Sequence, residues 1–322
     1  MSASKQLQSN PILLDQPAVH TTRGDLVSRI GNTPLFRLYR VADGIPAGVE
    51  VYVKAEQFNP GGSVKDRAAL YMIEQARRSG FMRGGRTLLD ATSGNTGIGY
   101  AMIGAAWGLS VSVCLPKNAS PERKRILRSY GAKIIESDPN GTTDSAQRLA
   151  HELAQKFPNT YVYLDQYNNE ANWRAHYEGT GPEIWQQTQG RVTHFVTCLG
   201  TTGTFVGTSR RLKEYKPTVR AISVQPESPL HGIEGMKHLP TAIVPGIYDP
   251  TLSDEEIRVS TEDAQATRDR LSLEEGLLVG TSSGANVFAA LRLARTLPSG
   301  SVVVTILCDS GERYLSQRED HL

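Results

Sequence analysis

Residues 59–67, Asn59-Pro60-Gly61-Gly62-Ser63-Val64-Lys65-Asp66-Arg67, form the stretch around which the chain is organised. One proline and two glycines predict a turn after a strand-like run at 49–54, and Ser63 is predicted to cap the helix that follows. Lys65 then lies in the first helical turn, where the positive end of the helix dipole disfavours an ammonium group. Such a lysine is a candidate amine nucleophile toward a carbonyl, that is, a Schiff-base lysine. On this stretch alone, a solvated lysine at a helix start is the simpler interpretation.

Length and composition exclude several classes of protein. A chain of 322 residues is too long for one small core, and two α/β domains are expected. Its 35 basic and 33 acidic residues nearly balance, and no basic block occurs, so nucleic acid is not an expected partner. Its seven histidines lack the spacing of a metal site, and no metal is expected. The three cysteines (Cys114, Cys198 and Cys308) lie in or beside apolar runs, which predicts buried thiols in a reducing compartment.

The amino-terminal region carries no apolar run of the kind that directs secretion. Residues 1–24 are polar and are predicted to form an arm. The longest apolar stretch, 98–107, has about half the length that a membrane span needs. We therefore expect a cytoplasmic protein with no membrane partner.

Strand-like and helix-like segments alternate along the rest of the chain. Strands are predicted at 35–39, 49–56, 87–91, 110–115, 132–136, 160–164, 194–198, 219–225, 256–260 and 301–307. Helices are predicted at 65–79, 96–107, 143–157, 169–188, 204–215, 261–274 and 285–296, with a further helix between Ser120 and Tyr130. This alternation predicts an α/β fold with two domains, each a parallel-rich twisted sheet flanked by helices. The charged run 122–128 is expected to be solvated helix surface.

Three glycine-rich or hydroxyl-rich turns precede predicted helices and are expected to gather at the edge where parallel sheets bind ligands. Gly200–Thr204 would present N–H groups and hydroxyls to a phosphate at a helix start. It lacks the lysine and spacing of a nucleotide P-loop, so a small phosphate ester fits better than ATP or NAD. Thr92–Gly97 suits a carboxylate, and Gly280–Gly284 resembles a plain helix cap. Taken alone, a structural turn explains 200–204 about equally well and explains 280–284 better, whereas a cap at 92–97 would need only one such residue and not six.

Together these turns resemble the cysteine synthase (O-acetylserine sulfhydrylase) family, in its B-type, among fold type II pyridoxal-phosphate enzymes. Five motifs occur in the family's order between Gly31 and Leu315. They are N-P-x-x-S-V-K-D-R at 59–67, T-S-G-N-T-G at 92–97, H-Y-x-x-T-G-P-E-I at 176–184, the phosphate loop at 200–204 and D-x-G-E-R-Y-L-S at 309–316. The resemblance implies a smaller mobile domain at 59–168, a larger domain at 25–58 plus 169–322, and an active site in the cleft between them.

The resemblance also implies roles for individual residues. Lys65 would hold pyridoxal 5'-phosphate as a Schiff base and then remove the substrate α-proton. The cofactor would further be bound by Asn95 at the pyridine O3′, by Gly200, Thr201, Thr202, Gly203 and Thr204 at the phosphate, and by Ser282 (or else Ser283) at the pyridine nitrogen. The amino-acid carboxylate would be bound by Thr92, Ser93, Gly94, Thr96 and Gln166. His176 and Tyr177 are expected to brace helix packing.

The implied reaction is a β-replacement. Because a serine is a poor acid, the pyridine nitrogen is expected to stay unprotonated, which favours expulsion of a β-leaving group over transamination. The product would be L-cysteine or S-sulfocysteine, made from O-acetyl-L-serine or O-phospho-L-serine and a sulfur donor through an aminoacrylate intermediate. Lys237 could attract an anionic group at the mouth of the cleft, or it could be an exposed loop lysine of little energetic value. The family is commonly homodimeric, and a homodimer is expected here.

Several alternatives to this reaction remain. One is cystathionine β-synthase chemistry with homocysteine as the nucleophile. Another is a serine or threonine dehydratase, although the S-F-K-x-R-G motif of those relatives is absent. A third, from another class, is a non-catalytic phosphate-binding protein, against which the intact Lys65 argues. The sequence decides neither the leaving group nor the sulfur donor.

Overall fold

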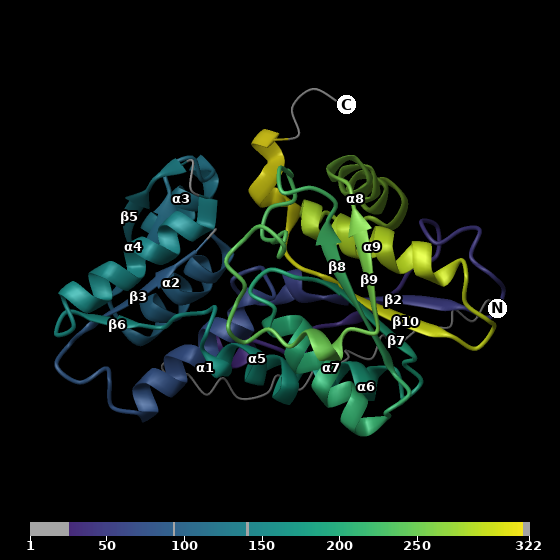
Figure 1. Ribbon diagram of the computed structural model, residues 1–322, viewed down its shortest axis with the longest axis horizontal. Helices are drawn as coiled ribbons and strands as arrows, with labels where there is room; N and C mark the ends of the chain where they lie inside the picture. The colour runs from purple at the N-terminus through teal and green to yellow at the C-terminus, as the bar shows by residue number, and fades with distance from the viewer. Residues whose placement is uncertain (1–25, 93, 140–141, 318–322) are drawn as a thin grey trace, which may run out of the picture.

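Two sheets organise the molecule (Figure 1). The computed structural model describes residues 26–92, 94–139 and 142–317, so the predicted arm at 1–24 and Ser93 lie outside the described residues. One sheet has six strands in the order β1-β2-β10-β7-β8-β9, and the other has four in the order β5-β4-β3-β6. Every strand pairing is parallel except that of β1 with β2. The predicted α/β class with parallel-rich sheets is confirmed.

The strands and helices lie close to the predicted ranges. The strands are β1 (Leu35–Arg37), β2 (Glu50–Ala55), β3 (Thr87–Ala91), β4 (Val111–Pro116), β5 (Lys133–Ser137), β6 (Tyr161–Tyr163), β7 (His194–Cys198), β8 (Arg220–Pro226), β9 (Glu255–Val259) and β10 (Val302–Leu307). The α-helices are α1 (Lys65–Arg78), α2 (Asn95–Trp107), α3 (Pro121–Ser129), α4 (Thr142–Lys156), α5 (Glu170–Ala175), α6 (Gly181–Gln187), α7 (Gly203–Tyr215), α8 (Thr261–Glu275) and α9 (Thr281–Ala294). Short helical segments are η1 (Val27–Arg29), η2 (Glu56–Phe58), η4 (His176–Thr180), η5 (Pro250–Leu252) and η6 (Gly311–Gln317).

The six-stranded sheet is covered by helices on both faces. Along β10, Val303 and Leu307 pack into the core formed with α9, whereas Val304 and Ile306 pack into the core that contains Ile184 of α6 and residues of α7. This alternation follows the period of two along a strand, and a sheet with both faces covered requires a continuous apolar run. Figure 1 shows α8 and α9 on one side of this sheet and α6 and α7 on the other.

The four-stranded sheet packs against the apolar helix α2. The prediction that this helix is buried is confirmed from Thr96 to Gly104. Small residues let it approach its neighbours, since a Cβ atom at Gly99 would lie 3.0 Å from the Cβ atom of Ala69 on α1. The helix ends at Gly108, whose φ of 69° favours glycine. All four strands of this sheet fall within 59–168, although the domain boundaries themselves stay a prediction.

Two local predictions agree with the structure. Helix α1 begins at Lys65, and Val64 before it already has helical φ and ψ angles. The Ser63 hydroxyl accepts a hydrogen bond from the Lys65 N–H at 3.3 Å, which is the contact expected of a capping serine. The helices predicted near 169–188 are found as α5 and α6 with the π-helical turn η4 between them, and such turns are often found at functional sites. Within the described residues, none of the helices combines the length and apolar character of a membrane span.

Candidate active site

Lys65 lies between two small cavities that the predicted site residues share. It is half-buried, and no hydrogen bond or ion pair of its Nζ atom is found among the described residues. One cavity is lined by Lys65 with Gly200, Thr201, Thr202 and Thr204. The other is lined by Lys65 with Thr96, Gln166, Gly200, Thr201 and Lys237. The fold thus brings one free amine together with the predicted phosphate turn and with part of the predicted carboxylate site.

The turn after β7 has the properties of an anion cradle. Thr202 has a φ of 71°, and no side chain caps the N-terminus of α7, whose first N–H groups have no partner within the helix. The Thr202 hydroxyl is buried and lacks a hydrogen-bond partner in the described part of the chain. A Cβ atom at Gly203 would lie only 2.0 Å from Asn172 Oδ1, so this position excludes side chains. Unpaired buried donors at a helix start fit a phosphate group.

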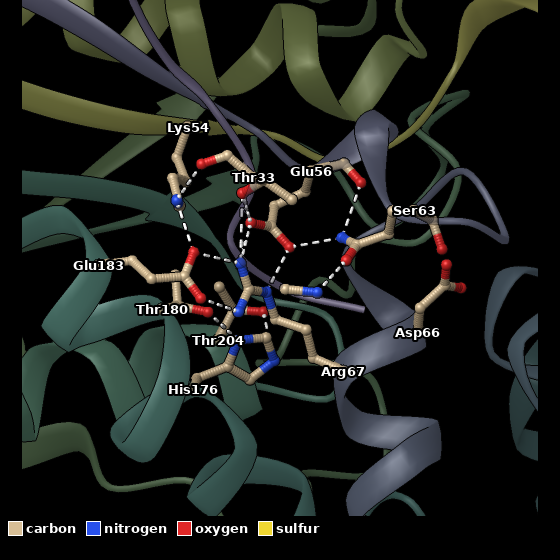
Figure 2. A network of polar contacts seen from close by, with 12 residues as sticks. Thr33, Lys54, Glu56, Ser63, Asp66, Arg67, His176, Thr180, Glu183 and Thr204 are labelled. Atoms are coloured by element: carbon tan, nitrogen blue, oxygen red, sulfur yellow. Dashed lines mark hydrogen bonds and ion pairs between the residues drawn. The ribbon is translucent and has the colours of Figure 1, made fainter. Parts of the chain in front are cut away.

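His176 supports this turn from the π-helical segment η4 (Figure 2). Its Nε2 atom lies 3.3 Å from Thr204 Oγ1, and its Nδ1 atom lies 2.9 Å from Thr180 Oγ1. Burial, together with the positive charge of Arg67, lowers the pKa of His176 to about 3. The ring is therefore neutral at physiological pH and has one donor and one acceptor. His176 is a positioning residue for Thr204, which is more specific than the helix-bracing role expected from the sequence.

Asn95 is oriented by the carboxy-terminal motif. Its Nδ2 atom donates to Asp309 Oδ2 at 2.6 Å, and its Oδ1 atom accepts from Arg313 Nη1 at 2.5 Å. The Tyr314 hydroxyl donates to the same Asp309 oxygen at 2.5 Å. Because an amide nitrogen carries two hydrogens, one N–H of Asn95 is left for a ligand. The D-x-G-E-R-Y-L-S motif thus has a role at the site that sequence reasoning did not assign to it.

The predicted carboxylate site is partly formed by the turn after β3. Thr92 Oγ1 accepts hydrogen bonds from the N–H groups of Gly94 at 2.9 Å and Gly97 at 3.1 Å, so this hydroxyl shapes the turn itself. Thr96 Oγ1 donates to Gln166 Oε1 at 2.8 Å, and Gln166 Nε2 donates to the Ala91 carbonyl. Thr96 and Gln166 therefore face the Lys65 cavity as a linked pair. Ser93 belongs to the same prediction and lies outside the described residues.

The two candidate serines lie in the first turn of α9. Ser283 Oγ accepts a hydrogen bond from the Cys308 N–H at 2.8 Å, whereas no hydrogen bond of the Ser282 side chain is found among the described residues. Both residues are buried, and neither lines the two Lys65 cavities. The engaged Ser283 hydroxyl leaves Ser282 as the less constrained of the two.

Lys237 is not an exposed loop lysine. Its side chain is only 6% exposed, and its Nζ atom forms an ion pair with Asp144 Oδ1 at 2.6 Å. It lies between the Lys65 cavity and a larger cavity of about 460 Å³. Arg123, expected on a solvated helix face, also lines the larger cavity and is buried. It forms an ion pair with Glu234 and lies 4.9 Å from the centre of the Tyr314 ring.

A buried cluster of charges fixes the helix that carries Lys65 (Figure 2). Arg67 binds Glu56 through Nε at 2.7 Å and Glu183 through Nη1 at 2.6 Å, and Lys54 binds Glu183 at 2.6 Å. Burial opposes ionisation of Glu56, but the Arg67 guanidinium outweighs it and lowers the pKa of Glu56 to about 2. Two cations thus face two carboxylates, and the first turn of α1 is tied to β2, η2 and α6.

Comparison with known proteins gives this geometry a family. Residues 26–309 match the family model described as pyridoxal-phosphate dependent enzyme. A cysteine synthase of Aquifex aeolicus is 49% identical over 94% of this chain and 93% of its own length. Cysteine synthase B of Salmonella typhimurium is 45% identical over 90% of this chain and 94% of its own length. The chain belongs to the cysteine synthase family of pyridoxal-phosphate dependent enzymes.

Solved structures agree with this family. The crystal structure of O-acetyl serine sulfhydrylase isoform 3 from Entamoeba histolytica superimposes with a TM-score of 0.85 at 35% identity. It covers 95% of this chain, which in turn covers 93% of that structure. The residues of the site fit the family's cofactor. The Thr202 hydroxyl, which has no partner among the described residues, and the N–H groups at the uncapped start of α7 can donate hydrogen bonds to a phosphate within the cavity that Lys65 lines.

Removing one member of the buried charge cluster is expected to destabilise the protein strongly. Arg67→Ala leaves Glu56 and Glu183 without their shared partner, and such a loss costs about 3–5 kcal/mol. Arg78→Ala on the same helix removes only an exposed ion pair with Glu74, which is worth less than about 0.5 kcal/mol. Thermal and urea unfolding measure the loss of stability in each variant. Similar midpoints for the two variants would show that the cluster does not anchor α1.

Asp90 is expected to make stability depend on pH. Its carboxylate accepts hydrogen bonds from the Tyr100 hydroxyl at 2.6 Å and the Gln166 N–H at 3.2 Å. Burial nevertheless raises the pKa of Asp90 to about 7. Between about pH 4 and pH 7 the unfolded chain releases this proton and the folded protein keeps it, so stability falls as pH rises by up to about 1.4 kcal/mol per unit.

Asp90→Asn removes this group from the pH profile. The variant should lose less stability than the wild type between pH 4.5 and pH 7, as measured by urea unfolding. Part of the slope remains, because burial also raises the pKa of Asp66 to about 7. Asp43→Asn in an exposed turn serves as the control and should keep the wild-type slope. A slope that is unchanged in Asp90→Asn contradicts the prediction.

Proposed function

We propose that the protein is a pyridoxal-phosphate dependent cysteine synthase, which replaces the acetate of O-acetyl-L-serine with a sulfur nucleophile to form L-cysteine. The observation that carries the proposal is that the Lys65 amine, for which no partner is found among the described residues, lines one cavity with the phosphate cradle. Cysteine synthases of 49% and 45% identity over nearly the whole chain support it. These relatives favour a cysteine-forming reaction over the alternatives of a cystathionine β-synthase and a serine or threonine dehydratase.

Each predicted cofactor ligand has a task in this proposal. When bound, pyridoxal phosphate supplies an electron sink that acidifies the α-proton of the amino acid and eases departure of its β-substituent. Gly200–Thr204 would hold the phosphate, and His176 would keep the Thr204 hydroxyl in place. The spare N–H of Asn95 would bind the pyridine O3′. Ser282 would face the pyridine nitrogen, where its weakly acidic hydroxyl does not transfer a proton.

The remaining residues act on the amino acid. Thr96 and Gln166, with Thr92, Ser93 and Gly94, would bind the substrate carboxylate at the start of α2. Helix α2 begins at Asn95, and its positive end favours an anion there. The Lys65 amine would take the proton from the substrate Cα and return it after the sulfur nucleophile has added to Cβ. Because its Nζ atom has no partner among the described residues, no hydrogen bond or ion pair has to break before Lys65 reaches the substrate.

Replacement of Lys65 tests the proposal directly. Lys65→Ala and Lys65→Arg should lower turnover of O-acetylserine by at least about 10²–10⁴-fold, the range typical of a lost general base. The wild-type protein incubated with pyridoxal phosphate should be yellow and should be bleached by borohydride, whereas both variants should resist this covalent reduction. Lys133→Ala, an exposed lysine on β5, is the control. Full turnover in the arginine variant contradicts the role of Lys65.

We further propose that Lys237 extends the substrate range to anionic groups such as O-phospho-L-serine or thiosulfate. Its position between the two cavities supports this role. Because Asp144 already neutralises it, an incoming anion must compete with that carboxylate.

Two variants separate these effects. Lys237→Ala should lower kcat/KM for O-phosphoserine about 10-fold more than for O-acetylserine, the loss of roughly one charge-assisted hydrogen bond. Asp144→Asn frees Lys237 from its carboxylate and should raise kcat/KM for O-phosphoserine relative to that for O-acetylserine. Lys133→Ala should leave the ratio unchanged. An equal loss of kcat/KM for both substrates in Lys237→Ala contradicts the proposed anion site.

The assembly and location of the protein are also proposals. A homodimer is supported by the exposed aromatic pair Phe36 and Phe58, whose rings lie 5.8 Å apart beside the edge strand β1. A cytoplasmic location is supported by the free thiols of all three cysteines, which a reducing compartment preserves.

A further inference from the structure

Two of the three cysteines meet at the floor of the Lys65 cavity. Cys198 ends β7, and Cys308 directly follows the neighbouring parallel strand β10. Their sulfur atoms are 3.9 Å apart, within hydrogen-bond distance for thiols. Both residues line the same small cavity as Lys65 and the phosphate turn. The two thiols are therefore close to each other, line one small cavity and lie next to the predicted cofactor site.

The surroundings of the two sulfur atoms shift the pKa values of the two thiols in opposite directions. Asn286 binds both residues, accepting from the Cys198 N–H at 2.7 Å and donating to Cys308 Sγ at 3.4 Å. The hydrogen bond from Cys308, aided by the charge of Lys65, lowers the pKa of Cys198. The same contact and burial raise the pKa of Cys308. Cys198 is thus the more readily ionised of the two thiols, and the Cys308 thiol lies beside it.

We propose that Cys198 and Cys308 form an oxidation site, at which a peroxide converts the thiol pair into a disulfide beside the predicted cofactor site. The Cys198 thiolate attacks one oxygen of hydrogen peroxide, the O–O bond breaks, and hydroxide leaves and takes up a proton to become water. Cys308 sulfur then attacks the sulfenic acid, and its proton leaves with the displaced hydroxyl as a second water. Two thiols and one peroxide give one disulfide and two waters, with sulfur oxidised and oxygen reduced.

The consequence for the site rests on the proposed function. A disulfide holds its sulfurs about 2 Å apart, so the two strand ends must shift their side chains toward each other. This movement changes the cavity floor beside Gly200 and Lys65. Bound pyridoxal phosphate would cover the same floor, so it is expected to slow the oxidation, and the disulfide is expected to weaken cofactor binding.

Intact-protein mass spectrometry tests the site. Holoenzyme and cofactor-free protein are treated with hydrogen peroxide and then with a thiol-blocking reagent. Both should lose about 2 Da, the two thiol hydrogens, and should keep one blockable thiol, with the reaction slower in the holoenzyme. Peptide mapping should join 198 to 308. Dithiothreitol should restore the mass and the affinity for pyridoxal phosphate.

Single variants identify the nucleophile and provide the control. Cys198→Ser should abolish the mass loss, and Cys308→Ser should instead leave a sulfenic acid on Cys198 that dimedone captures. Cys114→Ser should form the disulfide as the wild type does, because Cys114 lies buried in β4 of the other sheet. The proposal is overturned by a wild type that shows no loss of 2 Da, or by a Cys198→Ser variant that still shows it. Neither outcome affects the borohydride test of Lys65, so the two proposals can fail separately.

Discussion

The buried contact of Arg67 with Glu56 and Glu183 is the constraint on which the site depends. Lys65 is the first residue of α1, where a helix is most prone to fray, so a nearby anchor is needed to keep its side chain in one direction. Arg67, two residues further on, supplies that anchor with a planar guanidinium that binds two carboxylates at once. Because both carboxylates belong to the framework of the larger sheet, a movement of α1 would leave buried charges unpaired. The Lys65 amine is therefore held in place because breaking this cluster would cost free energy.

The same logic extends outward from Lys65 to two of the predicted cofactor ligands. His176 contacts Thr204, and Asp309 with Arg313 holds Asn95. Thr204 and Asn95 are thus held by residues that need not contact the cofactor. A side chain fixed in this way loses little conformational freedom when a ligand binds, so more of the contact energy remains as affinity. Thr202 differs, since its buried hydroxyl has no partner in the described chain and would gain one from a phosphate.

The sequence predicted the turns well and the residues behind them poorly, for a physical reason. A turn such as Gly200–Thr204 is decided locally, by glycine and hydroxyl residues between a strand and a helix, and the strand order then brings such turns to one edge. The partners of Arg67 are not local, because Glu183 lies 116 positions away. Periodicity cannot reveal such a pairing, and the same limit explains Arg123, which was expected in solvent but is buried against Glu234 and Tyr314. The cap predicted at Ser63 is local in the same way, and its hydroxyl accepts the hydrogen bond of the Lys65 N–H.

The electrostatics of the larger cavity follow from this distant pairing. Its two buried cations, Arg123 and Lys237, are each matched by a carboxylate, Glu234 and Asp144. A cavity with free cations would bind any anion and would release an anionic product slowly, whereas one whose cations are already paired gives an anion little net gain. Binding there requires a ligand that can displace a carboxylate, and a phosphate or thiosulfate with several strong acceptor oxygens does so better than a single acetate. In the proposed role of Lys237, the paired cations would therefore set a threshold on the kind of anion that binds next to Lys65, and the ion pair of Lys237 with Asp144 would control that threshold.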